Sequence, residues 1–514
     1  MMIKHYFKGL LATGFLIGGG QAGAQSTTAP LTLTIDTRTT FQTIDNFSAS
    51  DAWAGQFVGL WPDAKKDSIA DWLFSLDTLA DGSPKGIGLS MWRFNLGGGS
   101  TQQGDSSGIR DEWRRAESFI GADGQFDFNR QAGQQWFLKA AKQRGVPQFL
   151  IFLNSPPVQY TNNQKAYTQG GKCNIEPAVY GKVSDYIVRS IEGLQKKNGI
   201  CIQYISPVNE PQWDWSDGGQ EGNPYNNTQI AGLVRTLNDA LVSRRLPAKI
   251  LVTEAGHLKY LLRDEDKPGK GNQVQDLMDP TGANYIGGLK AVSNTIAGHS
   301  YFSTSPFRDA ITLRQELARR VASVKGLSYW QSEYCILGDN GGEINGSRRD
   351  TGMQSALYVA RTIHTDLAIA NATAWQWWLS ISPYNYKDGL VYIDKSKTGG
   401  QYQDSKLMWA LGNYSRFIRP GMQRIAATLV SPDSTCLATA YKDVKTGTVV
   451  AVLINTARTT QTVQVNEHTG KAFTRARAYV TSPNKKLQPQ SVNNTLLLEP
   501  ESVTTLVIAS PRKK

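Results

Sequence analysis

Two glutamates, Glu210 and Glu333, follow apolar segments and could act as a catalytic pair. Glu210 comes directly after Ile202–Asn209, in an Asn-Glu-Pro sequence, and Glu333 is the last residue of Ser328–Glu333. If both segments are strands of one parallel barrel, their carboxyl ends meet at the same mouth. Two facing carboxylates suit glycoside hydrolysis, because one donates a proton to the leaving oxygen while the other stays ionised beside the anomeric carbon. The alternative is that both are solvated charges at strand ends.

Other polar and aromatic residues also occur at the ends of the predicted strands, where a parallel barrel places its binding groups. Carboxylate, amide and imidazole groups can hydrogen-bond sugar hydroxyls, and indole rings can stack on the apolar face of a sugar. The alternatives are helix caps, ion pairs and hydrogen-bonded core residues. The candidate substrate-binding residues are Asp51, Trp53, Arg93, Asn95, Asn154, Asn209, Trp213, His299, Tyr301, Trp375 and Trp377.

Three of these candidates carry specific expectations. Asn209 precedes Glu210 and can hold a sugar 2-hydroxyl. His299 could touch Glu333 or a sugar hydroxyl, with a hydrogen-bonded core histidine as the alternative. Tyr301 could donate its hydroxyl to Glu333.

Tryptophans are dense after the first glutamate and in the eighth predicted strand. Trp213 and Trp215 could form an aromatic wall that raises the pKa of the neighbouring acid by desolvation. Strand alternation places Trp375 and Trp377 on one face and Trp378 on the other. We expect one of the first two to form the floor of the sugar site and Trp378 to pack against helices.

The pattern between Phe41 and Gly412 predicts the elements that would bring these residues together. Short apolar segments alternate with longer helical stretches, which is typical of βα units and a parallel sheet. Eight units predict an α/β fold, a (β/α)8 TIM barrel, over residues 41–412. A doubly wound sheet is the rival, but no GxGxxG sequence follows the first strand. The predicted strands are Ile44–Ser50, Ile87–Asn95, Gln148–Asn154, Ile202–Asn209, Lys249–Glu254, Thr295–Tyr301, Ser328–Glu333 and Ala372–Leu379.

Residues 413–514 have a different sequence pattern from residues 41–412. Short segments in which apolar residues alternate with polar ones lie between turn sequences. This pattern predicts a side β-sandwich domain. Leu31–Asp36 also alternates, so we expect residues 25–40 to add a strand to that sandwich. The predicted C-terminal strands are Leu429–Tyr441, Thr448–Asn455, Thr462–Val465, Ala476–Thr481 and Val503–Ile508.

Residues 1–24 have the composition of a signal peptide. Lys4 and Lys8 precede an apolar run of small residues, and Ala22-Gly23-Ala24 fits a cleavage site before Gln25. The sequence therefore predicts a secreted or periplasmic protein. No later run reaches the ~18 apolar residues of a membrane span, so we expect no integral membrane segment in the mature chain.

Composition narrows the partners and cofactors. Lys and Arg number 55 against 43 Asp and Glu, a formal net charge of +12, yet no dense basic run or nucleic-acid motif appears. The charge is either a solvated surface or an attraction to an acidic polymer, so we expect a polysaccharide partner and no nucleic acid. The sequence has no HExxH, CxxC or GxSxG motif, so we expect no metal, no cofactor and no serine triad. We also expect the protein to be a monomer. Disulfide pairing stays open for Cys173, Cys201, Cys335 and Cys436.

Seven segments spread over the mature chain form a specific combination: FQTIDNFSASDAW (41–53), WRFNLGGG (92–99), NSPP (154–157), ISPVNEPQW (205–213), GHSY (298–301), WQSEY (330–334) and LGNYSRFIRPG (411–421). Together they resemble glycoside hydrolase family 30, of the clan A barrels with the acid/base on strand four and the nucleophile on strand seven. The resemblance implies a retaining enzyme with a barrel and a side β-sandwich. It implies that Glu210 is the acid/base and Glu333 the nucleophile, and Arg93 resembles the arginine that orients the nucleophile.

Within that family, Asn154–Pro157, Ile205–Trp213 and Gln220–Gly222 are most similar to the endo-β-1,6-galactanases, which cut β-1,6-galactan side chains of arabinogalactan proteins. Two departures lie near the expected sugar site. Asn46-Phe47-Ser48 replaces the usual Gly-Phe-Gly, and Val158-Gln159-Tyr160 stands where a Trp-Met pair is common. The alternatives are an endo-xylanase, a β-1,6-glucanase, an exo β-glucosidase or xylosidase, and a non-catalytic carbohydrate-binding protein on the same fold.

Overall fold

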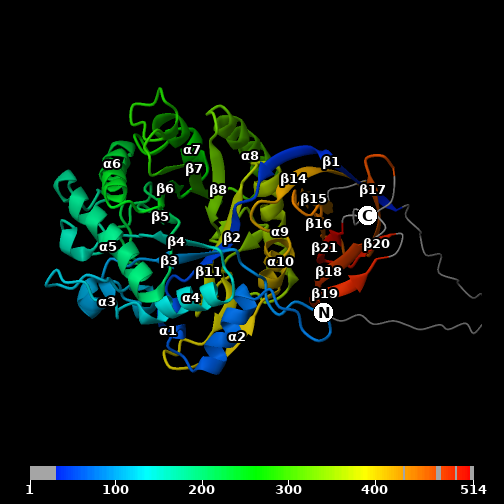
Figure 1. Cartoon of the computed structure of the whole chain (residues 1–514), viewed down its shortest axis with the longest axis horizontal. Helices are drawn as coiled ribbons and strands as arrows, with labels where there is room; N and C mark the ends of the chain where they lie inside the picture. Colours follow the sequence, from blue (N-terminus) through cyan, green and yellow to red (C-terminus); the bar gives the residue numbers. More distant parts are fainter. Residues whose placement is uncertain (1–29, 432–434, 471–475, 493–494, 510–514) are drawn as a thin grey trace, which may run out of the picture.

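The computed structural model describes residues 30–431, 435–470, 476–492 and 495–509. In this part of the chain, a closed barrel of parallel strands surrounded by helices lies beside a separate curled sheet (Figure 1). The fold class predicted from the sequence, a (β/α)8 barrel with a side β domain, is confirmed. The predicted signal peptide, residues 1–24, lies outside the described residues.

Eight parallel strands form the barrel in the order β11-β2-β3-β4-β5-β6-β7-β8, and pairing of β8 with β11 closes it. Each predicted barrel strand is present, although the ends differ by a few residues. The strands are almost continuously buried, because helices cover the outside and side chains fill the inside. They are β2 (Asn46–Ser50), β3 (Met91–Asn95), β4 (Gln148–Phe152), β5 (Tyr204–Ser206), β6 (Lys249–Ala255), β7 (Val292–His299), β8 (Ser328–Glu333) and β11 (Ala374–Ser382).

Helices follow the barrel strands and cover the outside of the barrel (Figure 1). A capping box begins α6, since the Asn226 side chain accepts the Gln229 N–H and the Gln229 side chain accepts the Asn226 N–H. Gly199 ends α5 with a φ of +64°, which glycine adopts without steric cost. The helices are α1 (Gly55–Val58), α2 (Asp63–Phe74), α3 (Ser100–Gln103), α4 (Ala132–Gln143), α5 (Tyr180–Asn198), α6 (Asn227–Ser243), α7 (Lys259–Leu262), α8 (Phe307–Ala322), α9 (Met353–Ala368) and α10 (Lys406–Ser415).

Short strands extend the barrel sheet beyond β11. β12 pairs parallel with β11, and β13 pairs antiparallel with β12. A separate two-stranded ribbon follows β8. These strands are β9 (Asp339–Asn340), β10 (Ile344–Asn345), β12 (Gly389–Ile393) and β13 (Tyr402–Asp404).

Nine strands form the side sheet, in the order β19-β18-β21-β16-β15-β14-β1-β17-β20. The N-terminal strand β1 (Leu31–Thr43) lies between β14 and β17, as predicted, and it buries Leu31, Leu33 and Ile35 at period two. The edge strand β20 also lies against β16 and β21, so the sheet curls onto itself. The other strands are β14 (Gln423–Val430), β15 (Cys436–Lys442), β16 (Val449–Asn455), β17 (Gln461–Glu467), β18 (Ala476–Ser482), β19 (Lys485–Ser491), β20 (Leu496–Leu498) and β21 (Ser502–Ile508).

Three features of the side sheet differ from the sequence prediction, and one of them is the edge strand β20, which was not predicted. Leu429–Tyr441, predicted as one strand, is divided between β14 and β15, which pair antiparallel. The edge strand β19 was not predicted, because its sequence KKLQPQS is polar and buries only Leu487. A strand at the edge of a sheet needs few apolar residues, so the hydrophobic pattern is weak there.

The side sheet attaches to the barrel through α9 and α10. Asn413 on α10 donates Nδ2 to the Tyr479 carbonyl at 3.0 Å and to Thr505 Oγ1 at 2.9 Å. Thr505 Oγ1 in turn donates to the Asn413 carbonyl at 2.6 Å. Asn413 and Thr505 are fully buried, so these bonds satisfy groups that water does not reach.

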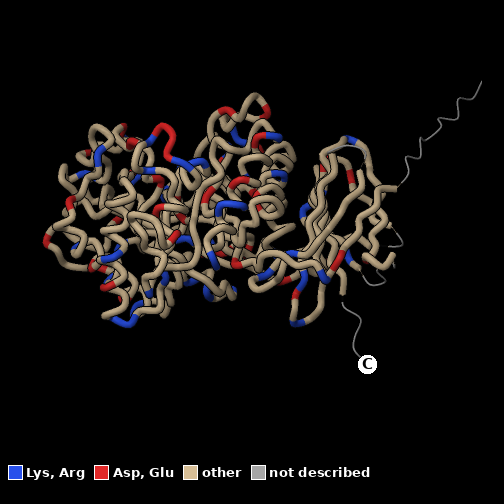
Figure 2. The backbone as a smooth tube through the Cα atoms, turned by 90° about the horizontal axis from the view of Figure 1, so that it is seen from above, with Lys and Arg blue, Asp and Glu red and all other residues tan. Residues whose placement is uncertain are grey.

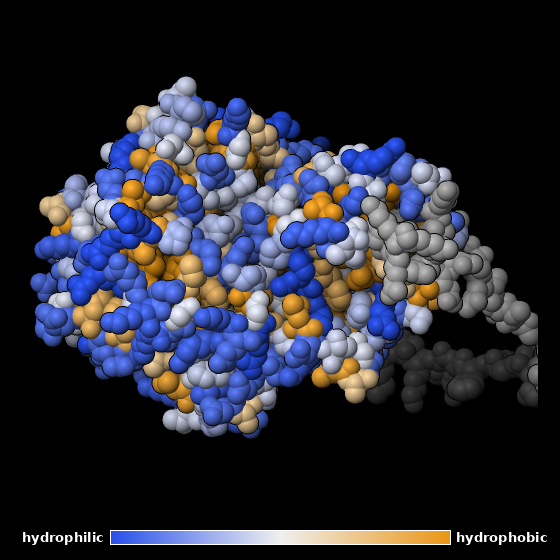
Figure 3. Space-filling view, in the orientation of Figure 1, coloured by the Kyte–Doolittle hydropathy of each residue, from blue (hydrophilic) through white to orange (hydrophobic). Residues whose placement is uncertain are grey.

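The surface carries charge of both signs. Basic and acidic residues are interspersed along the backbone of barrel and side sheet (Figure 2), and the face seen in Figure 3 is mainly hydrophilic with scattered hydrophobic groups. Among the described residues, no helix has both the length and the apolar character of a bilayer span. Cys173, Cys201 and Cys335 carry free thiols.

Candidate active site

A cavity of about 750 Å³ lies at the carboxyl ends of the barrel strands, and both Glu210 and Glu333 line it. Its volume falls within the range of about 300–1,000 Å³ that is typical of ligand sites. Four other predicted residues also line it: Trp53, Asn209, Trp213 and Tyr301. The remaining lining residues are Arg114, Trp215, Gln220, Phe302, Cys335, Leu337, Trp378, Tyr384, Asn385, Tyr386 and Asp388.

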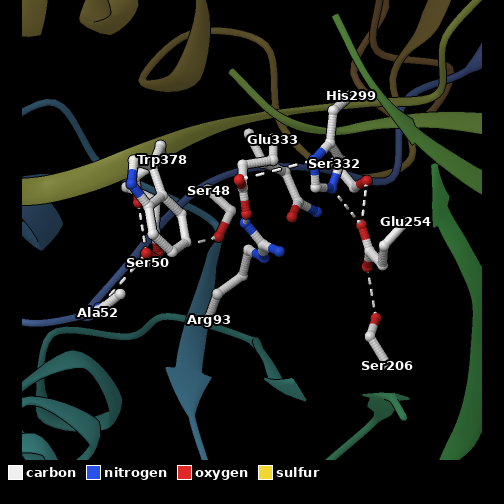
Figure 4. Close-up of polar contacts among 12 residues, drawn as sticks. Ser48, Ser50, Ala52, Arg93, Ser206, Glu254, His299, Ser332, Glu333 and Trp378 are labelled. Carbon is white, nitrogen blue, oxygen red and sulfur yellow. Dashed lines mark hydrogen bonds and ion pairs between the residues drawn. The ribbon is translucent and has the colours of Figure 1, made fainter. Parts of the chain in front are cut away.

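Glu333, at the end of β8, is held by two donors. Arg93 on β3 places Nη1 3.2 Å from Glu333 Oε2, and Tyr301 donates its hydroxyl to Oε1 at 3.0 Å. Figure 4 shows the guanidinium directed at the carboxylate. The guanidinium also lies over the Phe152 ring, 4.5 Å from its centroid, which fixes its position. Each oxygen of this buried carboxylate therefore has a donor, one from a guanidinium and one from a hydroxyl group.

Glu210 follows β5 in a constrained backbone conformation. Its φ is +44°, which is uncommon for a residue other than glycine. The Glu210 N–H donates to the Glu254 carbonyl at 2.8 Å, and Trp215 Nε1 donates to the Glu210 carbonyl at 3.1 Å. A left-handed conformation of this kind costs on the order of 1–3 kcal/mol, and it persists because the surrounding structure fixes the peptide groups.

His299, at the end of β7, connects Glu210 to Glu254. His299 Nδ1 lies 2.8 Å from Glu210 Oε1, and Nε2 lies 3.1 Å from Glu254 Oε2. Ser206 and Ser332 also donate to Glu254 (Figure 4). Burial alone would raise the pKa of Glu254, but the hydrogen bonds and the nearby cations lower it to about 2. Burial would lower the pKa of His299, but the surrounding carboxylates raise it to about 10.

The environment of Glu210 favours its protonated form. Burial raises the pKa of Glu210, and the negative charges of Glu333 and Glu254 act in the same direction, although His299 opposes them. An oxygen of Glu210 and an oxygen of Glu333 lie within 4.8 Å of each other. The cavity therefore holds a carboxyl group with a raised pKa beside a second carboxyl group that is paired with Arg93.

Glu210, His299 and Glu333 are close enough to be considered as metal ligands. The electrostatics do not favour that function. The neighbouring acidic groups raise the pKa of His299 to about 10, and an imidazolium has no lone pair for a metal. Arg93 adds a second positive charge beside Glu333. The group is better suited to proton transfer than to metal binding.

Comparison with known proteins identifies the family. The family model described as O-Glycosyl hydrolase family 30 matches residues 30–392, which is well over half of the chain. The chain belongs to glycoside hydrolase family 30. It is therefore a glycoside hydrolase, as the sequence motifs predicted.

Relatives of this family-30 enzyme include proteins with different activities. An endo-β-1,6-galactanase from Hypocrea rufa is 24% identical over 429 residues, which are 80% of this chain and 78% of that protein. The crystal structure of a conserved exported protein from Bacteroides fragilis is 32% identical, with a TM-score of 0.85 over 93% of this chain and 100% of that chain. The catalytic domain of GH30 xylanase C from Talaromyces cellulolyticus is 22% identical, with a TM-score of 0.67 over 93% of this chain and 100% of that chain.

Several predicted substrate-binding residues of the family-30 site do not line the cavity. Arg93 and His299 contact the two glutamates instead of the open space. Asp51 is buried, and its Oδ1 accepts the Asn95 N–H at 2.8 Å, so it secures the end of β3. Burial raises the pKa of Asp51 to about 7, against the hydrogen bonds that it accepts. Asn95 and Asn154 are likewise buried outside the lining, since a polar residue at a strand end can hold a loop as readily as a sugar.

The prediction for the tryptophans of β11 is wrong about which face points inward. Trp378 lines the cavity, whereas Trp375 and Trp377 are fully buried outside the lining. The alternation itself is correct for Trp375 and Trp377, because their rings are stacked with centroids 6.3 Å apart. Every residue of β11 is buried, so a period-two pattern separates the two faces without showing which one is interior.

Four of the lining residues that were not predicted come from the segment after β11. Tyr384, Tyr386 and Asp388 follow the eighth barrel strand, where binding groups are expected, so a signal was present in the sequence. Arg114 lies in the long connection after β3, far from any strand end. Its guanidinium carbon lies 4.7 Å from the ring centroid of Trp53 and 5.1 Å from that of Tyr384, and no motif marks it.

The run of three glycines after β3 supports the loop that carries Glu210. A Cβ at Gly98 would lie 2.9 Å from the Pro156 carbonyl, so glycine allows a close approach of the two backbones here. The N–H groups of Gly98 and Ser100 donate to the Glu221 carboxylate at 2.8 and 3.1 Å. These bonds tie the loop after β3 to the loop after β5.

Proposed function

We propose that this glycoside hydrolase is a retaining endo-β-glycosidase, with Glu210 as acid/base and Glu333 as nucleophile. The observation that carries the proposal is the separation of the two carboxylates across one cavity, within 4.8 Å between oxygens. Retaining glycosidases place these groups about 5–5.5 Å apart, whereas inverting ones need about 6.5–9.5 Å to admit a water. The short separation favours direct attack by Glu333 over attack by water.

The contacts of each glutamate fit a double displacement. Glu210 gives its proton to the glycosidic oxygen as Glu333 attacks the anomeric carbon, which breaks the glycosidic bond and forms a glycosyl ester. Formation of the ester removes the negative charge of Glu333, one of the charges that raise the pKa of Glu210. Glu210 is then the stronger acid and its anion is present to take a proton from water. That water attacks the anomeric carbon and releases Glu333.

The stereochemistry of the first product tests this mechanism. Proton NMR during the first minutes of hydrolysis distinguishes the anomers before mutarotation mixes them. We expect the β-anomer to appear first from a β-linked substrate. Initial appearance of the α-anomer would show inversion and contradict the role given to Glu333.

For the substrate, we propose the β-1,6-galactan side chains of arabinogalactan, cut in endo fashion. The support is the similarity to the Hypocrea rufa endo-β-1,6-galactanase over 80% of the chain. The cavity is lined by Trp53, Trp213, Trp215 and Trp378, whose rings suit the apolar faces of sugars. Asn209 Oδ1 has no hydrogen-bond partner among the described residues, so it can accept a sugar hydroxyl.

Digestion of a panel of β-linked polymers tests the substrate. The panel contains β-1,6-galactan, xylan and β-1,6-glucan, with aryl β-glucoside and β-xyloside as probes of exo action. We expect a ladder of β-1,6-galacto-oligosaccharides and much slower release of product from the others. Faster cleavage of xylan or glucan, or release of monosaccharide alone, would overturn the assignment. Binding of the galactan without any product would favour the non-catalytic alternative.

We further propose that the enzyme is exported with loss of residues 1–24 and that it is monomeric. We also propose that it binds an acidic polysaccharide. The Bacteroides fragilis relative is described as exported, and the chain has a formal net charge of +12. N-terminal sequencing of the protein from the culture medium or periplasm should begin at Gln25, and sedimentation should give the monomer mass. Activity on glucuronate-bearing arabinogalactan should fall as salt rises, because exposed charges are screened. Salt-independent activity would argue against charge attraction.

A further inference from the structure

A third carboxyl group, that of Asp388, lines the cavity beside the proposed catalytic pair. Asp388 lies in the segment between β11 and β12 and is only 6% exposed. Its Oδ1 is buried without a hydrogen-bond partner among the described residues. Leaving a buried polar atom unpaired costs about 1–3 kcal/mol, so such atoms are rare and call for an explanation.

The backbone around Asp388 is held rigidly. Trp377 Nε1 donates to the Asp388 carbonyl at 2.8 Å, and the Lys387 N–H donates to the Gly346 carbonyl at 2.7 Å. Lys387 Nζ donates to the Ser347 carbonyl at 2.7 Å. The carboxyl group is therefore presented to the cavity by a fixed segment, as preorganised binding groups are.

The groups that face Asp388 leave its carboxyl group without a full counter-charge. Burial raises the pKa of Asp388 to about 6, and Ser382, Arg114 and Arg349 oppose this only in part. No ion pair joins Asp388 to a basic side chain within the described ranges. The other titratable groups that interact with Asp388 are Cys335, Tyr386 and Tyr392.

The aromatic residues Trp53, Trp378 and Tyr384 form a wall of the same cavity that is suited to a sugar. The Trp53 ring lies edge-on to Trp378 and to Tyr384, with centroids 5.3 and 5.7 Å apart, and all three rings line the cavity with Asp388. Aromatic faces accept the apolar side of a sugar ring, and a carboxylate accepts hydrogen bonds from its hydroxyl groups. We propose that Asp388 is a substrate-binding residue whose carboxylate accepts a hydrogen bond from a hydroxyl group of the sugar held against this aromatic wall. The proposal rests on the glycosidase function of the same cavity.

Steady-state kinetics of Asp388→Asn test the proposal. The substrate is the polymer of the panel that the wild-type enzyme cleaves fastest. Loss of a hydrogen bond to a charged group corresponds to about a ten-fold or larger rise in KM, with kcat within about three-fold of the wild type. The wild-type KM should also rise as the pH falls below about 6, since protonation removes the acceptor charge, and the variant should lack this rise. The matched control is Asp394→Asn, an exposed aspartate outside the lining.

Thermal unfolding separates this role from a structural one. Removing an unpaired buried charge should leave the unfolding temperature of Asp388→Asn unchanged or higher, as at other sites that trade stability for function. An unchanged KM in Asp388→Asn would overturn the proposal, whatever happens to stability. If the galactan assignment is wrong, the wild-type enzyme will cleave another member of the polymer panel faster. The KM values of Asp388→Asn and wild type can then still be compared on that substrate.

Discussion

Glu210 and Glu333 are the same side chain at the same mouth of the barrel, but the structure surrounds them with different partners. Glu333 accepts a guanidinium hydrogen bond from Arg93 and a hydroxyl hydrogen bond from Tyr301. Glu210 contacts the His299 ring, which is itself held by the buried Glu254. One glutamate is thus paired with a permanent cation, and the other with an imidazole whose pKa the neighbouring acidic groups raise to about 10.

The difference in partners is what supports the two proposed roles, Glu210 as the acid and Glu333 as the nucleophile. Burial and two neighbouring negative charges raise the pKa of Glu210, which favours its protonated form. Arg93 places a permanent positive charge 3.2 Å from the Glu333 carboxylate. The roles follow from the partners, and changing a partner should alter one role more than the other.

The largest effect is expected from removing the nucleophile. Glu333→Gln keeps the shape of the side chain but cannot form a stable glycosyl ester, so kcat should fall by at least about 10⁴-fold. Turnover of the cleaved polymer and of an activated aryl glycoside measures the loss. Glu467→Gln, on the side sheet, is the matched control and should keep wild-type turnover. Near wild-type activity in Glu333→Gln would remove the nucleophile assignment.

Glu210→Gln should have a smaller effect that depends on the leaving group. A polymer substrate needs the proton, so kcat should fall by about 10²–10⁴-fold, while an aryl glycoside with a good leaving group should still form the ester. Azide should then restore turnover of the aryl substrate, because it attacks the ester without a general base. Equal losses on both substrates, with no response to azide, would contradict the division of roles.

Replacing Arg93 should impair the function of Glu333 more than that of Glu210. Arg93→Gln removes the charge that balances Glu333, and loss of one such electrostatic group typically costs about 10²-fold in kcat or more. Arg93→Lys keeps the charge without the planar fork and should retain more activity. Circular dichroism and thermal unfolding verify that each variant is folded. Equal activities of folded Lys and Gln variants would show that the charge of Arg93 is not what matters.

The smallest effect on rate is expected at His299, where the pH profile should change more than the maximum. His299 lowers the pKa of Glu210, against the raising effect of burial. Removing the cation in His299→Gln should therefore raise the pKa of Glu210 further and move the alkaline limb of kcat/KM to higher pH. A limb that stays in place or moves to lower pH would show that His299 does not act on Glu210.

Much of this architecture is predictable from the sequence. Apolar segments separated by helical stretches predict the eight barrel strands, and Glu210 and Glu333 at the ends of two of them predict the pair. Leu31, Leu33 and Ile35 alternate clearly enough to assign β1 to the side sheet. These features depend on local patterns that burial imposes directly on the chain.

Features that depend on contacts between distant segments are not predictable in this way. The interior face of β11 is ambiguous because both of its faces are buried. Asp51 could serve a sugar or the Asn95 N–H, and only the fold shows that the N–H takes its oxygen. Arg114 reaches the cavity from a long connection, where no periodicity marks it.

The most direct test of the central claim is to trap the covalent intermediate. A 2-deoxy-2-fluoro analogue of the sugar that the wild type cleaves, with an activated leaving group, slows ester hydrolysis more than ester formation. Mass spectrometry of the digested enzyme then locates the modified residue. We predict one sugar attached to Glu333, in wild type and not in Glu333→Gln. Attachment to Glu210, or inactivation without any attached sugar, would contradict the assignment of roles.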